Sequence, residues 1–168
     1  MQRRTLLTVG IATGALLAVA GGTMALLRPG RRDGKLTEAG RTMFAAVARA
    51  VLGPLLPQSA AVQAQMLQAH LDRVQATIAG MPPAMQAELD ELVTIVSSAP
   101  GRLALVGLGT DWATATDAQL TAALQGMRAS TLALRQQAFH ALRDITNASY
   151  FADPATWVAI GYPGPRAL

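Results

Sequence analysis

Apolar residues of the chain recur at the spacing of one helical face from residue 36 to residue 150. Thr37 is placed to cap a first helix, which Gly53-Pro54 ends. A second helix is predicted from Ser59 to Gly80, since glycine commonly terminates a helix. The two predicted apolar faces are Met43, Phe44, Val47, Val51 and Leu52, and then Val62, Met66, Leu67, His70, Leu71, Val74 and Ile78.

A third helix is predicted to begin at Met81-Pro82-Pro83, because proline suits the first helical turn. Its apolar face would carry Met85, Leu89, Leu92, Val93 and Val96, opposite a solvated face of Glu88, Asp90 and Glu91. Pro100-Gly101 is predicted to break the chain. The apolar piece from Arg102 to Leu108 is interpreted as one or two buried helical turns, followed by Trp112 in a polar turn.

Two more helices complete the pattern. Thr116 and Gln119 have the spacing of a capping box, which predicts a helix to about Arg128. Ser130 is placed to cap the last long helix, which would extend to about Tyr150. Its inner face would carry Leu134, Ala138, Phe139, Leu142, Ile145 and Ser149.

No alternating run is long enough to predict a strand. The expected fold is therefore all-α, an irregular bundle of five or six helices that follows an N-terminal apolar signal or anchor helix. Residues 1–35 would form this leader with a basic linker, of which Pro29 to Gly34 is expected to be flexible. Residues 36–168 would form a single domain with an extended Pro/Gly tail.

The leader begins with paired arginines, Arg3 and Arg4, directly before Leu6 and Leu7. This arrangement resembles a twin-arginine export signal, which the translocase reads on proteins that cross the membrane already folded. Gln2 and Leu6 depart from the usual pattern. An ordinary secretory signal or a plain membrane anchor is the alternative interpretation.

The segment after the arginines is compatible with both cleavage and retention. Thr5 to Leu27 is 23 residues without a charge, and a helix of that length would span ~35 Å, enough to cross a bilayer. Ala18-Val19-Ala20 is a small-x-small site of the kind that signal peptidase cuts, centred on Ala18 and Ala20. The leader would accordingly be removed at this site or stay as an inner-membrane anchor.

The positive charge of the chain belongs to this leader. Six of the 14 basic residues precede Leu36, where Asp33 is the only acidic residue, so that residues 36–168 carry eight basic and nine acidic side chains. The folded part therefore offers no basic surface for a nucleic acid. The chain contains no cysteine, which excludes disulfides, thiolate metal sites and covalent haem attachment.

No catalytic or metal-binding constellation is assembled from the remaining residues. His70 and His140 are the only histidines, and neither has a second histidine at the spacing of a metal pair. Asp144 lies one turn from His140, which indicates at most a contact on the helix surface. The methionines recur at helical spacing and are interpreted as core residues rather than haem ligands.

The C-terminal stretch concentrates the aromatic residues. Four of the seven aromatics fall within 13 residues, and Asp153-Pro154 is placed to start a short helix that Gly161 ends. These aromatics either pack on their own bundle or anchor a partner subunit, with arginines on the preceding helices as the polar part of the same contact. The candidate interface residues are Arg128, Arg135, Arg143, Tyr150, Phe151, Trp157, Tyr162, Pro163 and Pro165.

The pattern Tyr150-Phe151-Ala152-Asp153-Pro154, followed by Trp157 and by Ile160-Gly161-Tyr162-Pro163-Gly164-Pro165, resembles the C-terminus of the gluconate 2-dehydrogenase subunit 3 family. The resemblance implies an accessory subunit without catalytic residues or a cofactor of its own. Its partner would be a large FAD-dependent dehydrogenase of the glucose-methanol-choline type, which travels folded with the small subunit. A cytochrome c subunit would accept the electrons.

We therefore expect a non-catalytic periplasmic subunit that binds, stabilises and co-exports an FAD-dependent dehydrogenase through the twin-arginine pathway. The alternative is a stand-alone, membrane-anchored helical protein of the cell envelope with a scaffold role.

Overall fold

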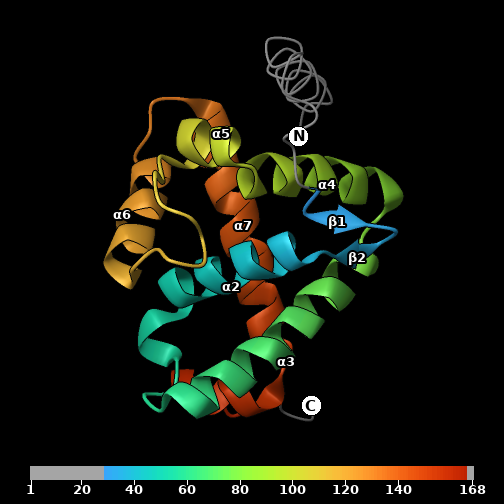
Figure 1. Ribbon diagram of the computed structural model, residues 1–168. Helices are drawn as coiled ribbons and strands as arrows, with labels where there is room; N and C mark the ends of the chain where they lie inside the picture. Colours follow the sequence, from blue (N-terminus) through green and yellow to red (C-terminus); the bar gives the residue numbers. More distant parts are fainter. Residues whose placement is uncertain (1–28, 166–168) are drawn as a thin grey trace.

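The structure is a computed structural model that describes residues 29–165 (Figure 1). The predicted export residues Arg3, Arg4, Leu6 and Leu7, the predicted cleavage residues Ala18 and Ala20, and the predicted anchor helix lie outside the described residues. Among the helices that are described, none combines the length and the apolar character needed to cross a membrane.

The described part of the chain is mostly helical, as the sequence predicts. Five α-helices have 12 to 20 residues: α2 (Glu38–Leu52), α3 (Ala60–Ala79), α4 (Pro83–Ser97), α6 (Asp117–Arg128) and α7 (Ala133–Phe151). The shorter elements are 3-10 helix η2 (Gly53–Leu55), helical turn α5 (Ala99–Gly101), π-helical turn η3 (Arg102–Val106) and 3-10 helix η4 (Pro154–Ile160).

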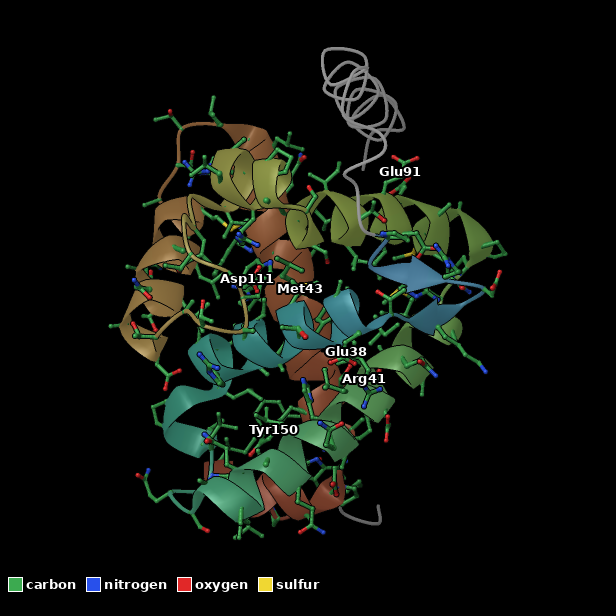
Figure 2. All side chains as sticks on the ribbon, viewed as in Figure 1. Glu38, Arg41, Met43, Glu91, Asp111 and Tyr150 are labelled. Carbon is green, nitrogen blue, oxygen red and sulfur yellow. The ribbon has the colours of Figure 1, made fainter. Side chains whose placement is uncertain are left out.

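Helix α2 is the centre of the body, and α3, α4, α6 and α7 all pack against it (Figure 1). Met43, Phe44 and Val47 of α2 are completely buried in the main hydrophobic core, and Figure 2 shows Met43 inside the body while Glu91 projects from α4. A second, smaller core lies at the opposite end of α2, and it consists of Ala48, Leu52, Leu56 and Tyr150.

Several predicted helix ends are confirmed by their hydrogen bonds. The Thr37 hydroxyl accepts a hydrogen bond from the Gly40 N–H at the start of α2. Thr116 and Gln119 form the predicted capping box of α6, in which each side chain accepts from the other residue's backbone N–H. These caps satisfy N–H groups that have no partner within the helix.

The expectation that Pro29 to Gly34 is a flexible linker is wrong. Residues Arg31–Arg32 (β1) and Lys35–Leu36 (β2) form a two-stranded antiparallel hairpin that packs on α4. The Arg31 side chain is 1% exposed and pairs with the carboxylate of Asp90, which therefore does not belong to a purely solvated face. Burying the guanidinium requires this carboxylate, because an unpaired buried charge is costly.

Two predicted boundaries also differ. Pro100-Gly101 does not break the chain but lies in the helical turn α5; the break is at Ser98, whose extended backbone interrupts the helix and whose hydroxyl accepts from the Gly101 N–H. Ser130 does not cap α7, because the N-cap position belongs to Leu132, and the Ser130 hydroxyl instead accepts from the Leu132 N–H.

Two residues assigned to apolar faces are exposed, namely Val62 at 51% and Met85 at 52%. Each is the third residue of its helix. The apolar spacing in the sequence therefore predicted burial in the first turn of each helix, and this was wrong. There α3 and α4 extend past the elements that cover them.

We predict that Gly40→Ala lowers the free energy of unfolding by about 2 kcal/mol through overpacking. A Cβ at Gly40 would overlap the carbonyl oxygen of Gly30, so that the hairpin would have to move away from α2. Gly109→Ala is the matched control, because nothing lies within 4 Å of a Cβ there. Chemical denaturation measures both variants, and equal stability of the two would contradict the close approach of α2 and the hairpin.

Candidate partner-binding surface

The C-terminal segment is a defined structure rather than a loose tail. The Asp153 carboxylate accepts a hydrogen bond from the Ala155 N–H at 3.0 Å and caps η4, and Pro154 occupies its first turn. Gly161 ends η4 with a left-handed φ of 70°, a conformation that glycine adopts at little cost. The predicted cap, short helix and terminator are therefore confirmed.

Side chains fasten this segment to the helical body. Arg73 of α3 donates to the Ser149 carbonyl of α7 at 3.1 Å and pairs with the Asp153 carboxylate at 3.1 Å. The Trp157 indole N–H donates to the Phe151 carbonyl at 2.7 Å, and the Thr156 hydroxyl bonds within the same turn. These contacts link α3, α7 and η4, so the outer face of η4 has a fixed position.

Tyr150 does not belong to a partner surface, and the prediction that placed it there is wrong. Its side chain packs in the smaller core and the residue is only 2% exposed. Its hydroxyl donates to the Leu55 carbonyl at 3.3 Å, and Figure 2 shows the residue among the helices of the body. The half-buried Phe151 packs beside it, with ring centroids 5.1 Å apart.

Trp157 and Tyr162 form a pair at the outer end of the segment. Their ring centroids are 5.1 Å apart at an interplanar angle of 61°, an edge-to-face arrangement. Trp157 is half-buried, whereas Tyr162 is 46% exposed. Pro163 and Pro165 are also exposed. The candidate residues therefore divide by exposure: Tyr150 packs inward, whereas Tyr162 and the two prolines face solvent.

Two further exposed residues of the same segment, Val158 and Ile160, were not among the predicted interface residues. Val158 is 82% exposed and Ile160 is 53% exposed. With Tyr162 they form the C-terminal apolar segment, defined as Val158, Ile160 and Tyr162. These three residues alternate along one short stretch of the chain. The stretch is too short for helical periodicity to predict which side of η4 faces solvent.

The three candidate arginines have different environments. Arg128 on α6 is exposed and donates to the Gln125 side chain at 2.8 Å. Arg135 on α7 donates to the carbonyls of Leu105 and Val106, at 2.8 and 3.2 Å. Arg143 pairs with the neighbouring Asp144 and lies over the Phe139 ring. Arg135 and Arg143 therefore make stabilising contacts within the chain itself, in addition to any contact with a partner.

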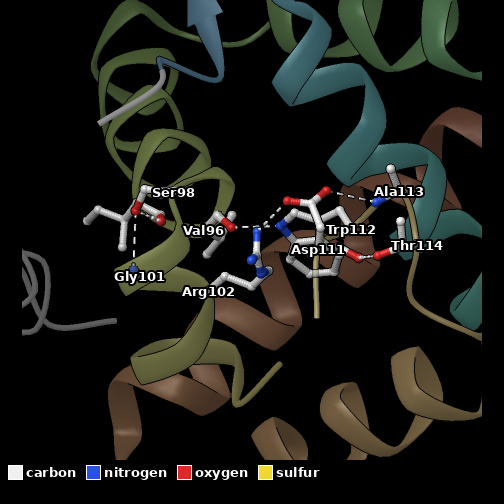
Figure 3. Close-up of polar contacts among 9 residues, drawn as sticks. Val96, Ser98, Gly101, Arg102, Asp111, Trp112, Ala113 and Thr114 are labelled. Carbon is white, nitrogen blue, oxygen red and sulfur yellow. Dashed lines mark hydrogen bonds and ion pairs between the residues drawn. The ribbon is translucent and has the colours of Figure 1, made fainter. Parts of the chain in front are cut away.

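A second group of polar contacts holds the chain between α4 and α6 (Figure 3). The Trp112 indole N–H donates to the Val96 carbonyl at 2.8 Å, and the residue is 3% exposed. Buried Arg102 pairs with Asp111 at 3.0 Å. The prediction of Trp112 in a polar turn thus missed its place in the core, because its carbonyl acceptor lies 16 residues earlier.

His70 is the buried ionisable group of this half of the molecule. The residue is completely buried in α3, its ring lies edge-on to Tyr150, and neither ring nitrogen has a partner among the described residues. Burial, and secondarily the Arg73 charge, lowers the His70 pKa to about 4. Burial raises the pKa of Tyr150, with Asp153 adding to this shift and Arg73 opposing it.

The other histidine lies on the surface. His140 is exposed, with its ring edge-on to Phe139 at 5.4 Å, while Asp144 pairs with Arg143. Within residues 29–165, no three His, Asp or Glu residues are placed to hold a metal ion.

Comparison of the chain with protein-family models finds no matching family, and comparison with curated proteins and with solved structures finds no significant match.

We predict that His70 makes stability acid-sensitive. Its pKa is about 4 in the fold, against the ordinary histidine value of 6.5, so the neutral ring stabilises the fold fully above pH 6.5. This contribution, up to about 3 kcal/mol, is lost as the pH falls from 6.5 toward 4.

The measurement is the free energy of unfolding from denaturation across this pH range. His70→Leu should flatten the acid dependence, whereas the exposed His140→Leu control should keep the wild-type profile. Equal slopes for wild type and His70→Leu would show that His70 protonation is not linked to folding.

Proposed function

We propose that the chain is a non-catalytic subunit that binds a larger protein through its C-terminal apolar segment. The observation that carries this proposal is the exposure of Val158, Ile160 and Tyr162 on a segment that ion pairs and hydrogen bonds hold in place. Solvent-exposed apolar side chains on a preformed support are typical of protein interfaces, because little ordering entropy is lost on binding.

The buried Arg31 and Arg102 and the half-buried Arg73 have carboxylate partners within the chain, which supports the same proposal. Arg31 pairs with Asp90, Arg102 with Asp111, and Arg73 with Asp153. Each pair joins segments that are distant in the sequence or fixes a turn. These side chains therefore stabilise the fold, and the C-terminal apolar segment remains exposed for interaction.

The resemblance of the C-terminal motif to the gluconate 2-dehydrogenase subunit 3 family indicates the partner. We infer a large FAD-dependent dehydrogenase, with a cytochrome c subunit in the same complex. In this proposal residues 36–168 hold the flavoprotein in the cytoplasm, and Arg3 and Arg4 direct the pair to the periplasm. A colourless chain anchored alone in the membrane would favour a scaffold role instead.

The double variant Val158→Asp/Ile160→Asp should weaken flavoprotein binding about tenfold or more, because two charges would be desolvated in the interface. Binding can be measured by co-purification and by titration of the separated subunits. Met85→Asp is the control, since Met85 is about as exposed as Ile160 but lies on α4 at the other end of the body. Unchanged affinity of the double variant would exclude this segment as the contact.

Replacement of Arg3 and Arg4 by lysine should retain the flavoprotein in the cytoplasm, because the translocase reads the arginine pair. Flavoprotein activity in periplasmic and cytoplasmic fractions measures the effect. The two lysines conserve charge, so a general loss of membrane targeting is not expected. Periplasmic flavoprotein activity at the wild-type level in this variant would refute the co-export model.

A further inference from the structure

A cleft of about 470 Å³ lies on the side of the body away from the C-terminal segment. One wall is the chain from Gly107 to Thr110, and the other is the face of α6 that carries Ala122, Ala123 and Gly126. Arg135 of α7 also lines the cleft. The small residues on α6 leave room for a polypeptide backbone to approach the helix closely.

The guanidinium of Arg135 lies between the two walls. Its Nε and one terminal nitrogen donate to the carbonyls of Leu105 and Val106 at the end of η3. A Cβ added at Gly107 would lie 3.1 Å from that terminal nitrogen, and one at Gly126 would lie 4.0 Å away. Arg135 pairs with no carboxylate among the described residues, although its guanidinium is charged and has further N–H donors.

Other hydrogen-bond donors in the cleft also lack acceptors. The Gln119 side-chain oxygen is used by the capping box, which leaves its amide N–H₂ group for another acceptor. Within residues 29–165, no backbone acceptor is present for the N–H of Gly109 or Thr110. The cleft therefore combines free hydrogen-bond donors with the single positive charge of Arg135.

The wall that carries these donors is held at both ends. The Gly107 N–H donates to the Arg102 carbonyl at 3.0 Å, and Gly107 has a left-handed φ of 80°. At the other end Asp111 pairs with Arg102, and Trp112 is fixed by its bond to Val96 (Figure 3). Because the two ends are fixed, the donors are positioned before anything binds.

We propose that this cleft binds an extended segment of the partner protein, with an Asp or Glu side chain of that segment against Arg135. A carboxylate offers two acceptor oxygens, which matches an arginine with remaining N–H donors and the Gln119 amide N–H₂ group that lines the same cleft. A single arginine without a basic cluster favours one carboxylate over a nucleic-acid backbone. This inference rests on the proposed function and assigns the partner a second contact, separate from the C-terminal apolar segment.

The test compares Ala122→Glu with Ala122→Gln. Ala122 is exposed and lines the cleft, and the two side chains have the same size. The glutamate places a competing carboxylate beside the binding position, so it should weaken flavoprotein binding about tenfold or more relative to the glutamine variant. Raising the salt concentration should reduce this difference.

Ala87→Glu on α4 is the control for added charge, since Ala87 is exposed and lies outside the cleft; it should bind like the wild type. Circular dichroism and thermal unfolding establish that all variants are folded. Equal affinity of Ala122→Glu and Ala122→Gln would overturn the carboxylate site while leaving the proposed function standing. A wild-type chain that binds no flavoprotein would instead overturn the proposed function. It would also overturn the proposal that a flavoprotein segment occupies the cleft.

Discussion

The burial of α2 is the constraint on which the rest of the structure depends. A helix that contacts α3, α4, α6 and α7 must present apolar or small side chains in nearly every direction, and α2 does so with Met43, Phe44, Ala46 and Val47. Gly40 extends this requirement to the hairpin, because its lack of a side chain lets Gly30 lie directly against the helix. Once α2 is enclosed, the ends of the other helices are fixed, and with them the C-terminal segment and the cleft beside α6.

The sequence predicts the helices well because their faces repeat regularly and their caps are local. The capping box at Thr116 and the cap at Asp153 need only residues within three positions of each other. What the sequence does not reveal is set by contacts between distant residues. Arg31 meets Asp90 across 59 positions, Tyr150 reaches Leu55 across 95, and Trp112 reaches Val96 across the end of α4. Because the sequence does not reveal these three contacts, it predicted a flexible linker, a partner-facing tyrosine and a polar turn at these positions.

The candidate partner-binding surface shows the same difference between local features, which the sequence predicts, and contacts between distant residues, which it does not. Which aromatic residues gather near the C-terminus is visible in the sequence, but which of them face outward depends on how η4 packs. Arg73, on α3, decides this by holding Ser149 and Asp153. The outward residues are then Val158, Ile160 and Tyr162, of which only Tyr162 was expected. In the proposed complex the inward polar groups maintain the shape of the subunit, while the C-terminal apolar segment and the Arg135 cleft contact the flavoprotein.

The central claim is that this chain binds a partner protein and that the partner carries out the catalysis. The most direct test is to purify the full chain from its native host under mild conditions and to measure the molar mass and the flavin absorbance of the same chromatographic peak. The account predicts a heteromeric peak that contains one large flavoprotein with bound FAD for each copy of this chain. A colourless peak with the mass of this chain alone would contradict it.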